Sequence, residues 1–286
     1  MSTTIAGRSG VFALGGRRTV TRLGFGSMQL TGRGVWGEPS DPDEAVRVLR
    51  RAVELGVDFI DTADSYGPFV AEKLIRRALH PYPESLTIAT KAGLTRTGPG
   101  EWHPVGRPEY LRQECELSLR HLGLERIELF QLHRIDPQVA LEDQVGELKA
   151  LQDEGKIGLI GLSEVDVRQL TEASRIAEIA SVQNLYNLTN RSAEDLLGHC
   201  EARRIGFIPW FPLATGELAR RDGPLRDIAA DHDASPSQIA LAWLLHRSPV
   251  MLPIPGTSSV EHLEDNMAAA GLELSDHDMD ALDSLA

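Results

Sequence analysis

IELFQLH at residues 127–133 and IGLIGLS at residues 157–163 are two short, largely apolar runs. A longer segment of helical periodicity separates them. Runs that are apolar on both faces are typical of parallel strands buried on either side. The same alternation of a short apolar run and a helical segment continues along the chain in both directions. It predicts a strand–helix unit as the repeated element of the fold.

Eight such strands are expected, at residues 23–28, 58–63, 86–91, 127–133, 157–163, 180–186, 206–212 and 250–256. Helices are expected between them, with the clearest boundaries at residues 41–56, 107–123 and 235–248. The second of these has Pro108 in its first turn and Gly123 at its end, which are the residues favoured at those positions.

Eight strand–helix units in a chain of 286 residues predict a closed (β/α)8 TIM barrel, an α/β fold. No linker or low-complexity tract divides the chain, so we expect a single domain over residues 1–286. Residues 11–24, before the first barrel strand, are expected to form a β-hairpin that plugs the bottom of the barrel. An open doubly wound sheet is the alternative. It is less favoured because GFGSMQ at 24–29 is not a glycine-rich dinucleotide turn.

The composition excludes several classes of partner. A formal net charge of -13 argues against nucleic acid or an anionic membrane surface. There is no run of about 18 apolar residues that would span a membrane, and the N-terminus lacks an apolar signal region. The two cysteines, Cys115 and Cys200, do not form a metal or disulfide pattern. We therefore expect a cytoplasmic protein with reduced thiols.

Four polar residues are expected to meet at the mouth of the barrel. FIDTADSYG at 59–67 ends a buried strand with Asp61 and places Tyr66 in the following loop, while Lys91 and His133 end two further strands. The carboxyl ends of parallel barrel strands converge on one face. Buried polar groups require partners, and these four can satisfy one another. Asp64, in the same loop, is interpreted as a residue that makes local turn hydrogen bonds.

The charges of these groups indicate an acid–base chemistry. A tyrosine hydroxyl has an ordinary pKa of about 10, and a neighbouring lysine ammonium is expected to lower it. An aspartate would hold the lysine charged, and a neutral histidine would donate a hydrogen bond to a carbonyl oxygen. Tyr66 could then protonate that oxygen as negative charge develops on it. Because no nucleophile accompanies the set, the carbon must receive a hydride from a bound cofactor, for which a nicotinamide is suitable.

The motifs FIDTADSYG, TIATKAG and LFQLHRID, together with RLGFGSMQL and IPGTSSVEHLEDNMAA, resemble those of the aldo-keto reductase family. Within that family the chain is similar to the bacterial pyridoxal reductase branch. The resemblance implies that Asp61, Tyr66, Lys91 and His133 are the catalytic tetrad. It also implies reduction of an aldehyde or ketone to an alcohol by NADPH, with NADH as a possible cofactor.

The resemblance further implies which residues bind the cofactor. They are Ser27, Met28, Ser163, Gln183, Trp210, Leu213, Thr215, Gly216, Gly256, Thr257, Ser258, His262, Asp265 and Asn266. Three positions depart from the pattern of many relatives: Glu164 replaces an Asn, Gly256 a Lys, and His262 an Arg. The last two changes remove positive charges that would hold a 2′-phosphate.

Trp36, Trp102 and His103 are expected to wall the substrate pocket. The branch implies a small aromatic aldehyde as the substrate, with pyridoxal as a candidate. A monomer or a small homo-oligomer is expected.

Two other functions remain open on the sequence. One is a sensor on the same fold that binds a nicotinamide cofactor with little turnover. The other is a metal-dependent hydrolase using Asp61, Asp64 and His133. It is weakly supported because no ligand cluster of metal-binding spacing is present, and we expect no bound metal.

Overall fold

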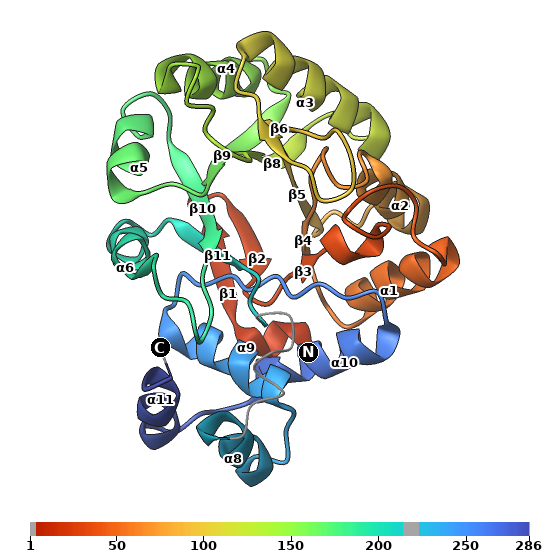
Figure 1. Cartoon of the computed structure of the whole chain (residues 1–286). Coiled ribbons are helices and arrows are strands. Elements are labelled where there is room, and N and C mark those ends of the chain that lie inside the picture. Colours follow the sequence, from red (N-terminus) through yellow and green to blue (C-terminus); the bar gives the residue numbers. More distant parts are fainter. Residues whose placement is uncertain (1–3, 214–222, 286) are drawn as a thin grey trace.

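The computed structural model describes residues 4–213 and 223–285. At its centre parallel strands form a ring, seen along its axis in Figure 1, with the order β11-β10-β9-β8-β5-β4-β3. These strands span Phe25–Gly26 (β3), Phe59–Asp61 (β4), Thr87–Ala92 (β5), Ile127–Leu132 (β8), Ile157–Ser163 (β9), Ile179–Leu185 (β10) and Gly206–Trp210 (β11).

The eighth expected strand, residues 250–256, closes the ring between β11 and β3. On one side, the amide of Phe207 donates to Val250 O at 2.9 Å, and the amide of Leu252 donates to Phe207 O at 2.8 Å. On the other side, the amides of Gly24 and Gly26 donate to the carbonyls of Pro253 and Pro255. Prolines have no N–H to donate, so the segment bonds on both sides without forming a regular ladder. The predicted closed barrel is confirmed, and the open sheet is excluded.

Helices surround the ring. They are α1 (Pro42–Glu54), α2 (Val70–Leu79), α3 (Pro108–Leu122), α4 (Leu141–Asp153), α5 (Val167–Ala173), α6 (Glu194–Arg203), α8 (Pro224–Asp231), α9 (Pro236–Arg247), α10 (Val260–Ala268) and α11 (Asp276–Asp283). Short 3₁₀ helices span Ala6–Ser9 (η1), Met28–Leu30 (η2) and Ala269–Gly271 (η4).

The helix boundaries follow the capping residues read from the sequence. Asp41 accepts hydrogen bonds from the amides of Asp43 and Glu44 at the start of α1, and Ser235 forms a capping box with Gln238 at the start of α9. Gly123 ends α3 with a φ of 70°, in the left-handed region that glycine adopts without strain.

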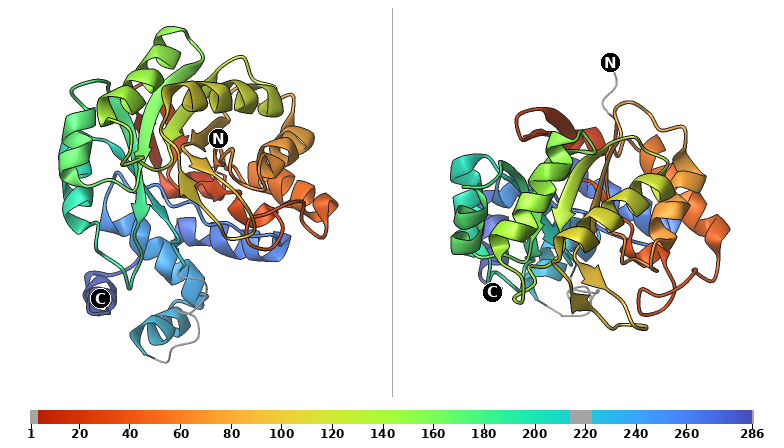
Figure 2. Two further views of the ribbon diagram at one scale, coloured as in Figure 1. Left: turned by 45° about the horizontal axis from the view of Figure 1, so that its top comes forward. Right: turned by 90° about the horizontal axis from the view of Figure 1, so that it is seen from above.

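The predicted N-terminal hairpin consists of β1 (Val11–Leu14) and β2 (Arg18–Thr21). Its Leu14 and Val20 are buried against residues that point into the barrel: Phe59, Ala89, Leu129, Leu159, Ala180, Ile208, Leu252 and Ile254. In the right-hand view of Figure 2 the hairpin lies at one end of the barrel, and the ribbon of β6 (Leu94–Thr95) and β7 (His103–Pro104) lies at the other. The hairpin therefore plugs the bottom, as expected, and leaves the opposite mouth for the site.

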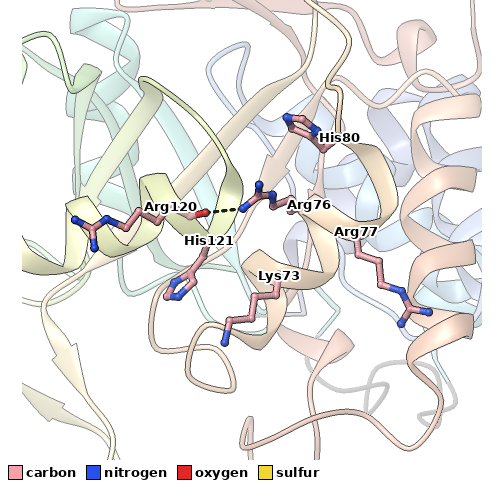
Figure 3. Close-up of a pocket in the computed structure, with 6 residues that line it drawn as sticks. All are labelled: Lys73, Arg76, Arg77, His80, Arg120 and His121. Carbon is pink, nitrogen blue, oxygen red and sulfur yellow. Dashed lines mark hydrogen bonds between the residues drawn. The ribbon is translucent and has the colours of Figure 1, made fainter.

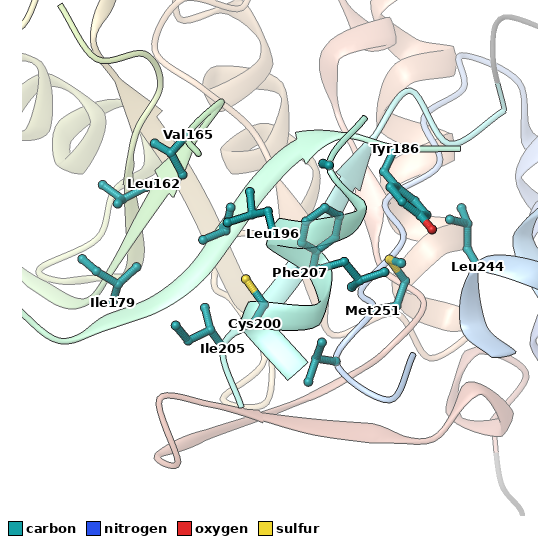
Figure 4. Packing of buried hydrophobic residues seen from close by; sticks show 14 of the residues in the cluster. Leu162, Val165, Ile179, Tyr186, Leu196, Cys200, Ile205, Phe207, Leu244 and Met251 are labelled. Atoms are coloured by element: carbon teal, nitrogen blue, oxygen red, sulfur yellow. The ribbon is translucent and has the colours of Figure 1, made fainter. Parts of the chain in front are cut away.

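The larger part of the core lies between the strands and the helices. Figure 4 shows part of this layer, where Phe207 of β11 and Met251 of the closing segment pack with Tyr186 and Leu244. Cys115 and Cys200 are both free and buried, and burial raises the pKa of each to about 12. None of the helices within residues 4–213 and 223–285 combines the length and apolar character that a membrane span requires.

Candidate active site

The predicted tetrad lies at the open mouth of the barrel because side chains alternate along a strand. Phe59 and Asp61 point to the same face of β4, two residues apart, and Leu129, Gln131 and His133 do so along β8. The first residue of each series, Phe59 or Leu129, packs with the N-terminal hairpin. The polar residues that follow it lie nearer the open mouth. The register of the strands then brings these polar residues together.

A cavity of about 550 Å³ opens at this mouth. We call it the mouth cavity. The predicted site residues that line it are Asp61, Tyr66, His133, Met28, Ser163, Gln183, Trp210, Gly256 and Trp102. Lys91 is fully buried beneath it.

The ammonium of Lys91 is the centre of the hydrogen-bond network. Its Nζ donates to Asp61 Oδ1 at 2.5 Å, to the carbonyl of Thr62 at 2.8 Å and to the Tyr66 hydroxyl oxygen at 3.2 Å. Its three N–H groups thus match three acceptors. Since Lys91 donates to the tyrosine oxygen, the hydroxyl proton of Tyr66 is left free for another acceptor.

The carboxylate of Asp61 connects Lys91 to two glutamine side chains. Its second carboxylate oxygen, Oδ2, accepts hydrogen bonds from Gln183 Nε2 at 2.9 Å and Gln131 Nε2 at 3.2 Å. Burial lowers the pKa of Lys91, but the charge and hydrogen bonds of Asp61 and Tyr66 outweigh burial and raise it above its ordinary value. The lysine therefore stays charged although it has no exposed surface.

The expected lowering of the Tyr66 pKa is not found. Burial raises the pKa of Tyr66, and it prevails over the opposing effect of Lys91, while the charge of Asp61 adds to the increase. The net pKa lies above the ordinary value. The sequence argument named the lysine correctly but omitted desolvation, which disfavours a phenolate. Tyr66 is therefore a protonated hydrogen-bond donor over the whole neutral range.

His133 is a neutral imidazole. Burial lowers its pKa well below the ordinary value, and the positive charges of Lys91, Arg134 and Arg96 lower it further. Its Nδ1 lies 3.3 Å from Ser65 Oγ. The ring stands edge-on to Tyr66, with 5.9 Å between the ring centroids. A neutral imidazole in this place can donate a hydrogen bond to the same oxygen that Tyr66 would protonate.

The residues expected to hold a nicotinamide lie along one wall of the mouth cavity. Ser163 and Gln183 provide the polar groups of this wall, and Trp210 provides a partly buried aromatic surface. The hydroxyl of Ser27, between the cavity-lining residues Gly26 and Met28 in the chain, is buried and has no hydrogen-bond partner among the described residues. A hydroxyl and an amide side chain next to an aromatic face fit a ring that carries a carboxamide.

Glu164, at the position where many relatives are expected to have Asn, is bonded within the protein. Its Oε1 accepts hydrogen bonds from Trp210 Nε1 at 2.6 Å and from the amide of Leu185 at 2.8 Å. Its backbone has a φ of 54°, in the left-handed region. The carboxylate is thus bound to the aromatic residue of the wall.

Five of the expected cofactor-binding residues lie on α10 or just before it and do not line the mouth cavity: Thr257, Ser258, His262, Asp265 and Asn266. Thr257 is buried, Ser258 and His262 are exposed, and Asn266 is buried. Asp265 accepts hydrogen bonds from Ser235 and Gln238 and so serves to join α10 to α9. Leu213 packs against the main core, while Thr215 and Gly216 lie outside the described residues.

Of the expected substrate-pocket residues, only Trp102 lines the mouth cavity. Trp36 instead lies against Arg96, whose guanidinium carbon is 5.7 Å from its ring centroid. His103 is exposed, with Nε2 3.1 Å from Thr97 Oγ1. Trp36 and His103 are therefore not among the described residues that line the mouth cavity, and their assignment to the substrate pocket stays a prediction.

Four residues of the site were not anticipated in these roles: Ser65, Gln131, Arg134 and Glu164. Gln131 had a signal in the sequence, because it precedes His133 by two positions and so shares its face of the strand. Asp64 also differs from expectation. It is buried, and neither carboxyl oxygen makes a hydrogen bond of standard geometry.

A second concavity of about 450 Å³ lies on the outside of the barrel, between α2 and α3 (Figure 3). It is lined by Lys73, Arg76, Arg77, His80, Arg120 and His121. Several of these lie in the last turns of the two helices, where positive charge is favourable. It contains no tetrad residue. In the part of the chain that the structure covers, there is no cluster of His, Cys, Asp or Glu that could hold a metal ion.

Comparison with known proteins gives consistent matches. The family described as "Aldo/keto reductase family" matches residues 22–286. An uncharacterized oxidoreductase of Schizosaccharomyces pombe is 54% identical over 260 residues, which cover 91% of this chain and 85% of the relative. The pyridoxine 4-dehydrogenase of Escherichia coli is 42% identical, over 97% of this chain and 99% of the relative.

Solved structures agree with these relatives. A glycerol dehydrogenase from Gluconobacter oxydans superposes with a TM-score of 0.88 at 26% identity, over 97% of this chain and 95% of the other. An aldo-keto reductase from Klebsiella pneumoniae, determined in complex with NADPH, gives a TM-score of 0.83 at 26% identity, over 100% and 95% of the two chains.

Proposed function

The chain belongs to the aldo/keto reductase family and is an NADPH-dependent enzyme of carbonyl reduction, and we propose that it converts a small aromatic aldehyde to the alcohol with Tyr66 as the proton donor. Pyridoxal is the first candidate substrate. One observation carries the assignment of the acid: Tyr66 OH lies 3.2 Å from the buried ammonium of Lys91, which is itself bound by Asp61.

NADPH fits the residues at the mouth. Ser163 and Gln183 would hold the nicotinamide carboxamide and Trp210 its ring, while Ser27 offers a free hydroxyl. The start of α10, with Ser258 and His262, would hold the phosphate-bearing end, since a helix N-terminus favours anions. The bound cofactor would supply a hydride to the carbonyl carbon.

The side chains of the tetrad supply the proton and stabilise the developing charge. The substrate oxygen would accept hydrogen bonds from the Tyr66 hydroxyl and from neutral His133, whose depressed pKa keeps it from competing as an acid. As charge develops on that oxygen, Tyr66 transfers its proton. Lys91, already donating to the tyrosine oxygen, stabilises the phenolate that forms. Burial excludes water from this group of charges and so strengthens them.

The cavity and the relatives support an aromatic aldehyde. A volume of about 550 Å³ suits a small ligand. The walls carry the flat side chains of Trp102, Trp210 and Phe211 beside Met28. A relative with 42% identity is named pyridoxine 4-dehydrogenase, an activity on the alcohol of the same pair.

The test is consumption of NADPH by the purified enzyme with pyridoxal, followed by absorbance, with pyridoxine identified as the product. Tyr66→Phe should lose about 10²–10⁴-fold in kcat, because general acid catalysis contributes that much. Binding of NADPH, followed by fluorescence, should remain in the variant. Full activity in Tyr66→Phe would eliminate the assigned acid. A wild-type enzyme that binds NADPH but reduces no aldehyde of a broad panel would instead favour a cofactor-binding sensor.

A further inference from the structure

We propose that Arg134 forms an anion subsite in the mouth cavity, which selects aromatic aldehydes carrying a carboxylate or phenolate group. This inference rests on the proposed function and specifies its substrate class.

Arg134 follows the tetrad histidine directly, at the end of β8, and its side chain lines the mouth cavity. One guanidinium nitrogen, NH1, donates to the carbonyl of His133 at 2.7 Å and to Ser163 Oγ at 3.1 Å. These two bonds anchor the guanidinium between the tetrad and the wall expected to hold the nicotinamide. Its position is therefore set by the protein before any substrate arrives.

Among the residues that the structure describes, no carboxylate pairs directly with the Arg134 guanidinium. Among the described residues that line the mouth cavity, Arg134 is the one Arg or Lys. Within the described ranges no carboxylate forms an ion pair with it. Glu164 acts on it only at longer range, because its Oε1 is bonded to Trp210 and Leu185. Asp61, the acid of the cavity floor, is paired with Lys91.

An unpaired cation in a partly buried place carries a desolvation penalty that a ligand can relieve. Burial lowers the pKa of Arg134, which reflects that penalty. The structure shows no hydrogen bond from its Nε or NH2 to any of the residues described, so the edge of the guanidinium that carries these two donors is available. A guanidinium fork binds a carboxylate or a phenolate by charge-assisted hydrogen bonds. Arg134 lines the same cavity as Tyr66 and His133, so an anion bound to it would share that cavity with the reacting carbonyl.

A neutral aromatic aldehyde would leave this cation unpaired, whereas an anionic one would neutralise it. The preference for the anionic aldehyde is therefore a difference in free energy between two transition states whose carbonyl chemistry is the same. A purely positioning role for Arg134, in which it only holds His133 and Ser163, predicts no such difference.

The experiment compares kcat/KM for the three carboxybenzaldehyde isomers with kcat/KM for their methyl esters, using NADPH. We expect the wild-type enzyme to prefer at least one acid over its ester. Arg134→Met should lower that acid-to-ester ratio about tenfold or more, the effect of losing a charge-assisted hydrogen bond. Arg134→Lys, which keeps the charge without the fork, should give an intermediate ratio. Arg168→Met removes an exposed charge on α5 as a matched control and should leave the ratio unchanged.

The outcomes are distinguishable. An unchanged ratio in Arg134→Met, or a wild-type enzyme that prefers every ester, overturns the anion subsite and leaves the proposed function intact. A wild-type enzyme that reduces neither acids nor esters overturns both. If Arg134→Met does not fold, competitive inhibition of the wild-type enzyme by benzoate and by benzamide decides the question. Stronger inhibition by benzoate supports the subsite, and equal inhibition overturns it.

Discussion

The indole Nε1 of Trp210 donates a 2.6 Å hydrogen bond to the carboxylate of Glu164. Glu164 directly follows β9 and Trp210 is the last residue of β11. The amide of Leu185, at the end of β10, donates to the same carboxylate oxygen. One carboxylate thus connects three strand ends and sets the orientation of the aromatic side chain expected to face the nicotinamide. Oε1 of Glu164 is thus engaged by the protein itself.

Glu164→Ala should raise the KM for NADPH about tenfold, since it releases Trp210 and leaves the Leu185 amide without its acceptor. Glu164→Gln keeps an acceptor oxygen and should restore most of the affinity. The dependence of kcat on pH should be the same in both variants as in the wild-type enzyme. Glu172→Ala, which removes an exposed carboxylate on α5, is the control. Equal KM values for the alanine and glutamine variants would show that the hydrogen bond does not orient the ring.

The buried pair of Lys91 and Asp61 should be strongly coupled in stability. Lys91→Met leaves the Asp61 carboxylate buried beside Gln131 and Gln183 without its cation. We expect it to lower the free energy of unfolding by about 3–5 kcal/mol. The double variant Lys91→Met with Asp61→Leu should recover part of that loss, although it has no activity. Urea denaturation of the wild type, Lys91→Met, Asp61→Leu and the double variant measures the coupling, and simple additivity of the two single changes would contradict it.

The stability contribution of Asp64 should depend on pH. Burial raises its pKa well above the ordinary value, and the charges of Glu72 and Glu114 raise it further. The folded state binds this proton more tightly than the unfolded chain. The contribution is therefore complete below the unfolded pKa of about 4 and is lost as pH rises through the folded pKa.

Asp64→Asn should accordingly be more stable than wild type at neutral and higher pH, and should gain nothing near pH 4. Denaturation at a series of pH values measures the difference, with the exposed Asp280→Asn as control. A gain that is constant across the series would show that Asp64 does not carry the proton.

The pH profile of the reduction should be flat through neutrality. His133 is held neutral by its depressed pKa, so it contributes no inflection near its ordinary value of 6.5. The raised pKa of Tyr66 keeps it protonated until above its ordinary value of 10.0, where kcat should fall. Measurement of kcat under saturating substrate and cofactor tests this. A descending limb near neutrality would mean that Lys91 prevails over burial when the cofactor is bound.

Gly26 and Gly256 should resist substitution because their backbones meet where the barrel closes. A Cβ at position 256 would lie 2.6 Å from Gly26 O, and one at position 26 would lie 2.6 Å from Ile254 O. Gly256→Ala should lower the free energy of unfolding by about 1–3 kcal/mol. Gly146→Ala, inside α4 with open space around it, should instead stabilise the protein by up to about 1 kcal/mol. Equal thermal midpoints for both variants would contradict this account.

The barrel was predictable because its signals are local. Apolar runs of strand length recur with helical segments between them, and Asp41, Ser235 and Gly123 mark helix ends by bonds within their own turns. The closing segment lacks a regular ladder at Pro253 and Pro255, but its apolar pattern still placed it correctly. The convergence of Asp61, Lys91 and His133 followed from one rule, that parallel strands end at the same face.

What stayed out of reach depends on neighbours that are distant in the chain. Which of Trp36, Trp102 and His103 lines the mouth cavity depends on contacts that the sequence does not show. The guanidinium carbon of Arg96, for example, lies 3.5 Å from the ring centroid of Trp102 and 5.7 Å from that of Trp36. The bond between Glu164 and Trp210 joins residues 46 positions apart. The role of Asp265 in bracing α9 likewise arises only when two helices pack.

The sequence by itself determined the closed barrel, the identity of the four polar residues at its mouth and the kind of chemistry they share, because strand periodicity and chain direction place them without reference to packing. The tertiary structure alone decided the protonation state of Tyr66, the proposed acid. The pKa of Tyr66 is a balance between a nearby ammonium and the loss of water around the phenol, and only the folded environment fixes how much water is lost.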